Sequence, residues 1–233
     1  MAPFAGSGVA RVETACDLGS SPGDFEMTSR ISTALWALLA VFSLLIGAGS
    51  LRYLLPHVPA IPPDVAKNLL RHPWLAIHAG LASVALIVGP IQFVPKLRAA
   101  RPRLHRALGR VYVFACLAAG GAGLLLAWGT NAGPVAQLGF GTLAVAWIVC
   151  TAQALRLAMA RRIVEHRRWM IRSFALTFAA VTLRLYLPIA PILGYPFMDG
   201  YRIISWMAWV PNLIVAELYL RRAGLLRPAM ARA

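Results

Sequence analysis

Long stretches without a charged side chain limit what this sequence can fold into. Residues 31–51 carry no charge between Arg30 and Arg52, and no charged residue occurs between Arg110 and Arg156. A helix that crosses a bilayer needs about 20 mostly apolar residues, because each residue adds ~1.5 Å across ~30 Å of hydrocarbon. The turn-forming residues 129–134 divide the longer stretch. The pattern therefore predicts six membrane helices, at about residues 31–52, 74–95, 107–128, 135–158, 170–193 and 201–220.

The composition agrees with a membrane protein. Hydrophobic residues make up 59% of the chain and charged residues 13%, whereas soluble domains have about 45–50% and about 25%. The net charge of +15 lies in short clusters between apolar stretches, so no nucleic-acid surface is predicted. The three cysteines show no metal-type or redox-type spacing. These features predict an all-α, polytopic membrane helical bundle in contact with the lipid bilayer.

Basic residues also predict the orientation, because cytoplasmic loops are enriched in Lys and Arg. Three alternate regions are strongly basic: the connection between the second and third helices, the one between the fourth and fifth, and the segment after the sixth. Both termini are therefore predicted to be cytoplasmic.

The ends of the chain differ in composition from the middle. Residues 1–26 contain half of the acidic residues and no apolar periodicity, which predicts a disordered tail. Residues 27–222 form the predicted membrane domain, and 223–233 a cytoplasmic tail. Two alternatives stay open at this stage: translation from Met27, and cleavage of the first helix as a signal peptide. Its apolar run is longer than the usual 7–15 residues, which favours a retained helix.

Two histidines near the predicted cytoplasmic side suggest a haem site. His105 opens the third helix and His166 the fifth, at similar depth, and bis-imidazole ligation needs such a pair. Gly109 lies one turn after His105 on the same helix face and would leave room for a flat group. Arg110 and Arg172, together with Arg106, are candidates to pair with the propionates. The alternative is that both histidines contact lipid headgroups or cap loops.

Two further polar residues lie deeper in predicted helices. His78 stands near the outer end of the second helix and is followed by small residues at helical spacing, which predicts either a close helix contact or a slot for a planar cofactor or quinone. Arg184 falls near mid-membrane, where an ionised side chain must face the bundle interior, a cavity or an acidic partner. Glu217, the acidic residue within a predicted helix, is displaced from Arg184 by roughly 10 Å along the helix axis. Arg184 is therefore either a packing residue or a binding residue.

Several of these segments together resemble a family of predicted bacterial membrane proteins, domain-of-unknown-function family 2306. The resemblance rests on His78 with Gly80 and on segments 89–93 (GPIQF), 104–112 (LHRALGRVY), 166–172 (HRRWMIR) and 180–184 (AVTLR). It implies a helical membrane domain with Arg184 and the three histidines as its signature, and it implies no established activity. With this resemblance the expected location is the bacterial inner membrane.

A second resemblance is to the transmembrane cytochromes b of the ascorbate-reducible type. Leu104-His105 with Leu108-Gly109 is similar to a ligand motif of that family, in which the third and fifth helices share a haem. In that family the second and fourth helices share another haem. His78 on the second helix matches one of its ligands, but the fourth helix has no histidine.

The sequence thus predicts a membrane protein that carries a b-type haem between His105 and His166 and exchanges electrons with a quinone or a partner protein. Two other classes are open: a small transporter or lipid-binding protein that uses Arg184 and Gln92, and an accessory subunit of a larger membrane complex. No pattern predicts the paired broken helices of many transporters, and enzymatic activity is left undecided.

Overall fold

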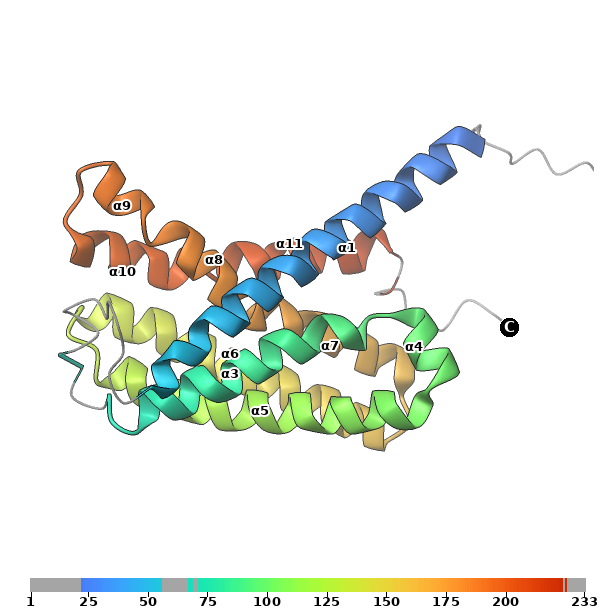
Figure 1. The fold of residues 1–233 in the computed structure, drawn as a ribbon, viewed down its shortest axis with the longest axis horizontal. Coiled ribbons are helices and arrows are strands. Elements are labelled where there is room, and N and C mark those ends of the chain that lie inside the picture. The colour runs from blue at the N-terminus through green and yellow to red at the C-terminus, as the bar shows by residue number, and fades with distance from the viewer. Residues whose placement is uncertain (1–21, 56–66, 69–70, 224, 226–233) are drawn as a thin grey trace, which may run out of the picture. The chain divides into compact units, whose positions relative to one another are not determined.

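The described part of the chain is helical and contains six segments long and apolar enough to cross a membrane (Figure 1). The computed structural model describes residues 22–55, 67–68, 71–223 and 225. The six segments are Thr33–Leu54, Trp74–Gln92, Pro102–Trp128, Pro134–Met159, Ile163–Ile192 and Phe197–Arg222. The predicted all-α, six-span architecture is confirmed, whereas the orientation of the termini stays a prediction.

The chain divides into two compact units, residues 1–37 and 38–233. The first unit contains the start of α1 (Pro22–Ser50), so residues 22–26 of the predicted tail are helical, and residues 1–21 lie outside the described part. The second unit contains the end of α1, the short η1 (Leu51–Leu54) and all the other helices. The contacts described below belong to this second unit.

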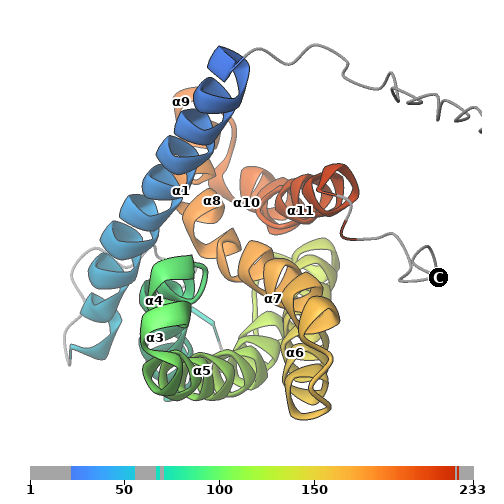
Figure 2. The same cartoon turned by 90° about the vertical axis from the view of Figure 1, so that its right-hand side faces the viewer.

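Four helices form the core of the second unit: α3 (Trp74–Gln92), α5 (Pro102–Trp128), α6 (Pro134–Met159) and α7 (Ile163–Thr177). Each packs against the next along the chain, and α7 also contacts α3 (Figure 2). Their buried faces are rich in small side chains such as Ala85, Ala115 and Ala119, which let helix backbones approach closely. At Gly89 an added Cβ would lie 2.6 Å from the ring of Phe174, so this contact requires glycine.

Prolines mark where several helices begin. The short α4 (Pro95–Ala100), α5 and α6 each have proline in the first turn, where its missing N–H leaves no hydrogen bond unmade. The third span therefore starts at Pro102 rather than near residue 107, and part of the predicted loop before it is the helix α4. Gly133 precedes α6 with a φ of 87°, a conformation that favours glycine.

The fifth and sixth spans are each broken, which the sequence analysis did not anticipate. The fifth comprises α7, α8 (Ala179–Tyr186) and α9 (Ile189–Ile192), and the sixth comprises α10 (Phe197–Met207) and α11 (Val210–Arg222). Pro211 explains the second break, because its ring removes the bond to residue 207 and clashes with that carbonyl. Near the first break, Thr177 donates to the carbonyl of Ser173 at 2.9 Å, a bond to the preceding turn that bends helices.

The two breaks contact each other. The hydroxyl of Thr182 donates to the carbonyl of Ala208, and the side-chain amide of Asn212 donates to the same carbonyl at 3.1 Å and to Thr182 Oγ1 at 3.0 Å. Carbonyls freed at a break are therefore satisfied by side chains within the protein, as a bilayer requires.

Large apolar side chains cover the outside of the helices. Phe114 is 68% exposed, Leu138 63% and Val215 64%. Such residues on helices of this length face lipid rather than water. The fold is that of a multi-pass membrane protein.

Candidate functional site

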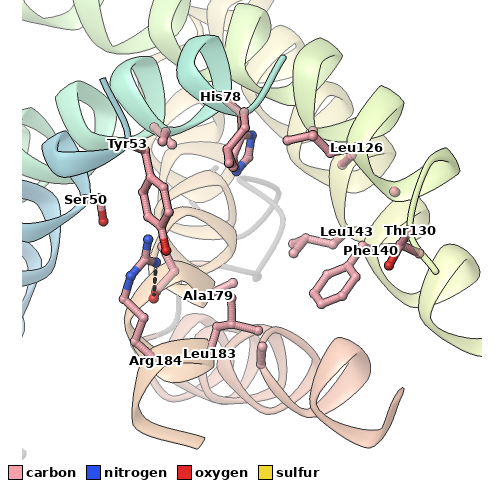
Figure 3. A pocket seen from close by; sticks show the side chains of 18 of the residues that line it. Ser50, Tyr53, His78, Leu126, Thr130, Phe140, Leu143, Ala179, Leu183 and Arg184 are labelled. Atoms are coloured by element: carbon pink, nitrogen blue, oxygen red, sulfur yellow. Dashed lines mark hydrogen bonds between the residues drawn. The ribbon is translucent and has the colours of Figure 1, made fainter. Parts of the chain in front are cut away.

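A cavity of about 330 Å³ runs into the bundle from the end at which α3 begins and α5 ends (Figure 3). Its size is at the lower end of the range of small-molecule sites, and its walls are largely apolar, as in most such sites. Ala82, Leu86, Leu143 and Leu183 are among the apolar side chains that line it. His78 and Arg184, predicted separately from the sequence, line this same cavity.

His78 points into the cavity from the first half of α3 (Figure 3). Its Nδ1 lies 2.9 Å from the carbonyl oxygen of Ala119. Because a carbonyl can only accept, Nδ1 is the donor, and Nε2 of the neutral ring then carries a lone pair. A Cβ at Gly123 would lie 3.0 Å from that Nδ1, so the missing side chain leaves room for the imidazole. The glycine that accommodates the imidazole lies on α5, whereas the predicted stripe of small residues follows His78 on α3, where Ala82 also lines the cavity.

Arg184 reaches the cavity from α8 on the opposite wall (Figure 3). One of its terminal nitrogens, Nη1, donates to the carbonyl of Ala180 at 2.9 Å. Within the described residues, the ion pairs involve other arginines, and Arg184 has no carboxylate partner. An arginine carries five N–H donors, so most of its hydrogen-bonding capacity is left for an occupant of the cavity.

The sequence analysis missed several polar residues that line the cavity, among them Tyr53, Asn68 and Tyr201. Tyr53 and Tyr201 both interact electrostatically with Arg184. Tyr201 is held between the rings of Phe140, at 5.1 Å, and Phe197, at 5.6 Å. Tyr53 lies in η1, Asn68 before α3 and Tyr201 within α10, so their distance along the sequence hides that they line one cavity.

One wall of the cavity belongs to the segment between the two helix breaks. Residues of α8 and α10, including Leu183, Arg184 and Tyr201, form it. Arg202 fixes the start of α10 to the turn between α5 and α6, because its Nε donates to the carbonyl of Ala132 at 2.7 Å. The wall that carries Arg184 is thus joined to α7 and α11 through non-helical residues.

A buried network of hydroxyl groups borders the cavity at Thr177. Thr177, which lines the cavity, accepts from the indole Nε1 of Trp147 at 2.9 Å and lies 2.9 Å from the Tyr112 hydroxyl. Because its single proton goes to the carbonyl of Ser173, Tyr112 must donate to Thr177. Tyr112 then accepts from the Ser173 hydroxyl at 3.0 Å, and that hydroxyl accepts from Thr151 at 2.7 Å. These bonds assign the donor and the acceptor at each step of this hydrogen-bond network.

The two histidines of the predicted haem site do not line the cavity. His166 Nδ1 lies 2.8 Å from the carbonyl of Ala154, and the buried Nδ1 of His105 has no hydrogen-bond partner. The two rings are within electrostatic range of each other. A Cβ at Gly109 would lie 3.5 Å from Gln92 Oε1, so Gly109 faces this amide.

The arginines predicted to bind propionates have different surroundings. Arg172 forms a two-point ion pair with Glu217, with distances of 2.5 Å from Nε and 3.0 Å from Nη2, and its guanidinium lies 4.9 Å from the centre of the Trp169 ring. Arg110 is exposed. Glu217 takes Nε and Nη2, so the Nη1 donors of Arg172 would be left for a propionate, and its predicted role stays a prediction. Glu217, considered as a partner of Arg184, is bound to Arg172 instead.

No group of three His, Cys, Asp or Glu side chains in the described residues could hold a metal ion. His57 lies outside those residues. Cys116 and Cys150 are free and buried, which is typical of cysteines that act as small packing residues.

The fold and the cavity define a polytopic helical membrane protein with a ligand-sized, partly charged internal site. The sequence model of a family described as "Predicted membrane protein (DUF2306)" matches residues 75–220. The chain belongs to this family, and the match covers every helix that lines the cavity except the end of α1 and η1. No curated protein and no solved structure matched the chain.

Proposed function

We propose that this protein, in the inner membrane of a bacterium, binds a small amphiphilic molecule in the cavity between His78 and Arg184. The observation that carries the proposal is a ligand-sized apolar cavity lined by two polar side chains. Arg184 keeps most of its N–H donors available, and the imidazole of His78 is oriented by its hydrogen bond to Ala119. Burying a cation in a membrane domain is expensive and such residues are rarely without a function. A few polar groups within apolar walls are what orients a small ligand.

The broken helices support a binding role further. Breaks in two adjacent membrane helices are a feature of transporters, in which half-helices surround the substrate site. Here the segment between the breaks carries Arg184, so a small movement of that segment would change the access to the cavity. A transporter or lipid-binding protein, one of the classes left open by the sequence, therefore agrees best with this geometry.

Filling the cavity tests the proposal. Ala82 lines the cavity, whereas Ala152 is exposed on α6 and does not. The protein in phosphatidylcholine nanodiscs is titrated with decanoate, 1-decanol, decylamine and a short-chain quinone, whose carbonyls also accept hydrogen bonds. We expect saturable binding of at least one of these by wild type and Ala152→Phe, and loss of that binding in Ala82→Phe. Equal uptake by both variants and wild type would contradict the proposal.

Electron transfer through a haem held between His105 and His166 is a second candidate function. One observation favours it: the Nδ1 of His166 donates to a backbone carbonyl, which leaves Nε2 free in the way usual for metal-ligating histidines. His105 and His166 would hold the iron, and the haem would supply one-electron chemistry.

The absorption spectrum of purified protein, oxidised and then reduced with dithionite, tests this candidate. With haem bound we expect a Soret band and a sharp reduced α-band that disappear in His105→Ala and in His166→Ala. His72, exposed before α3, provides the control, because His72→Ala should keep the bands. A featureless spectrum from cells well supplied with haem would exclude this candidate, and co-purification with a large partner without either ligand would favour an accessory subunit.

A further inference from the structure

We propose that the occupant of the cavity is a small amphiphilic carboxylic acid whose carboxylate binds Arg184. This inference rests on the proposed function and adds the chemical class of the ligand. It follows from the charges that line the cavity, from the hydrogen bonds still open at Arg184, and from the size of the space.

The charges in the cavity have one sign. Arg52 and Arg184 both line it, and none of the described lining residues is acidic. Arg184 is partly buried and loses hydration that no carboxylate of the described residues replaces, while the exposed Arg52 adds a second positive charge to the same cavity. An anionic ligand would compensate both charges, whereas a cationic ligand would add to the repulsion.

The donors around Arg184 suit a carboxylate. The Ala180 carbonyl occupies Nη1, so the other nitrogens of the guanidinium can form the two-point contact that matches a planar carboxylate. Tyr53 and Tyr201 line the same cavity and interact electrostatically with Arg184. Their hydroxyls can donate to the same carboxylate. On the other wall, Nε2 of His78 can accept a hydrogen bond from a hydroxyl of the ligand or from water.

The rest of the cavity suits a short apolar body. The walls away from Arg184 consist of side chains such as Leu86, Leu143 and Leu176. A volume of about 330 Å³ is at the small end of ligand sites, which favours one short chain over a lipid with two acyl chains. A carboxylate head with one apolar chain satisfies both ends of the cavity.

The experiment compares ligands that share a ten-carbon chain and differ in the charge of the head group. Decanoate, 1-decanol and methyl decanoate are titrated into wild type in phosphatidylcholine nanodiscs, with Ala82→Phe nanodiscs as the background for partition into lipid. We expect decanoate to bind about 10- to 100-fold more tightly than either neutral ligand, the range typical of hydrogen bonds to charged groups. This comparison uses wild-type protein and does not depend on the folding of an arginine variant.

Variants then assign the preference to one residue. Arg184→Gln should remove the preference for decanoate and leave 1-decanol binding within about twofold, while Arg184→Lys should keep part of it because the charge remains. Arg156→Gln, at an exposed arginine of α6 outside the cavity, should behave as wild type.

The outcomes separate this inference from the proposed function. Equal affinity for decanoate and 1-decanol, or tighter binding of decylamine, overturns the carboxylate inference while the cavity remains a binding site. A decanoate preference that persists in folded Arg184→Gln also overturns it. Saturable binding of none of the ligands overturns the proposed function itself.

Discussion

Tyr112→Phe is the variant whose effect can be worked out most fully from the structure. Tyr112 is completely buried, and its hydroxyl lies 3.0 Å from Ser173 Oγ and 2.9 Å from Thr177 Oγ1. The donor order shows that Tyr112 donates to Thr177 and accepts from Ser173. The substitution keeps the ring, so it removes two hydrogen bonds between α5 and α7 with little change in packing.

The expected magnitude follows from these two bonds. Hydrogen bonds between membrane helices contribute on average about 0.6 kcal/mol and at most about 1.7 kcal/mol. The hydroxyl of Ser173 loses its acceptor but can turn towards a carbonyl of its own helix, as serines in membrane helices do. Tyr112→Phe should therefore lower the free energy of unfolding by about 1–2 kcal/mol, or the Tm by about 2–8 °C for a domain of this size.

The assay is thermal unfolding in one detergent at fixed protein concentration, followed by intrinsic fluorescence. Tyr219→Phe is the matched control, because Tyr219 is 51% exposed on α11 and should leave the Tm unchanged. A double-mutant cycle with Ser173→Ala should give a coupling energy of about 0.6–1.7 kcal/mol. An unchanged Tm in Tyr112→Phe, or zero coupling to Ser173, would refute the deduced network.

Three further predictions concern the ion pair, the imidazole and the orientation. Arg172→Ala should destabilise the protein by about 1–2 kcal/mol, since the pair with Glu217 is partly buried, and the exchange of the two residues should restore part of the loss in the same thermal assay. Gly123→Ala should weaken ligand binding by displacing His78, and unchanged affinity would argue against a role for this imidazole. Asn131→Cys, exposed between α5 and α6, should react with a membrane-impermeant maleimide in intact cells; protection until lysis would reverse the predicted topology.

The membrane spans were predictable because hydrocarbon permits few alternatives. Uncharged stretches of sufficient length must form helices there, and the predicted ranges agree closely with Trp74–Gln92 and Pro134–Met159. The break at Ala208–Trp209 was also predictable in principle, since Pro211 cannot bond to residue 207. Near Phe178 the local signal is the bond from Thr177 to the carbonyl of Ser173, which is common in unbroken helices, so that break was not predictable.

The candidate site was predictable only residue by residue. The chemical cost of a polar group in a membrane singled out His78 and Arg184, but a one-dimensional pattern could not show that they share a cavity. The sequence analysis grouped Arg172 with the histidines of the cytoplasmic side, which stays a prediction, and did not anticipate its ion pair with Glu217, 45 residues away along the chain. Pairing across helices depends on rotation and tilt, and helical periodicity alone does not determine these.

Photoaffinity labelling tests most directly whether the cavity is a binding site. Wild-type protein in nanodiscs is irradiated with a diazirine derivative of decanoic acid, and the labelled residues are identified by peptide mass spectrometry. Adducts should concentrate at the cavity-lining residues within segments 75–86 and 176–187, and should disappear with excess decanoate. Labelling confined to lipid-facing side chains such as Phe114 and Leu138, without competition, would contradict the account.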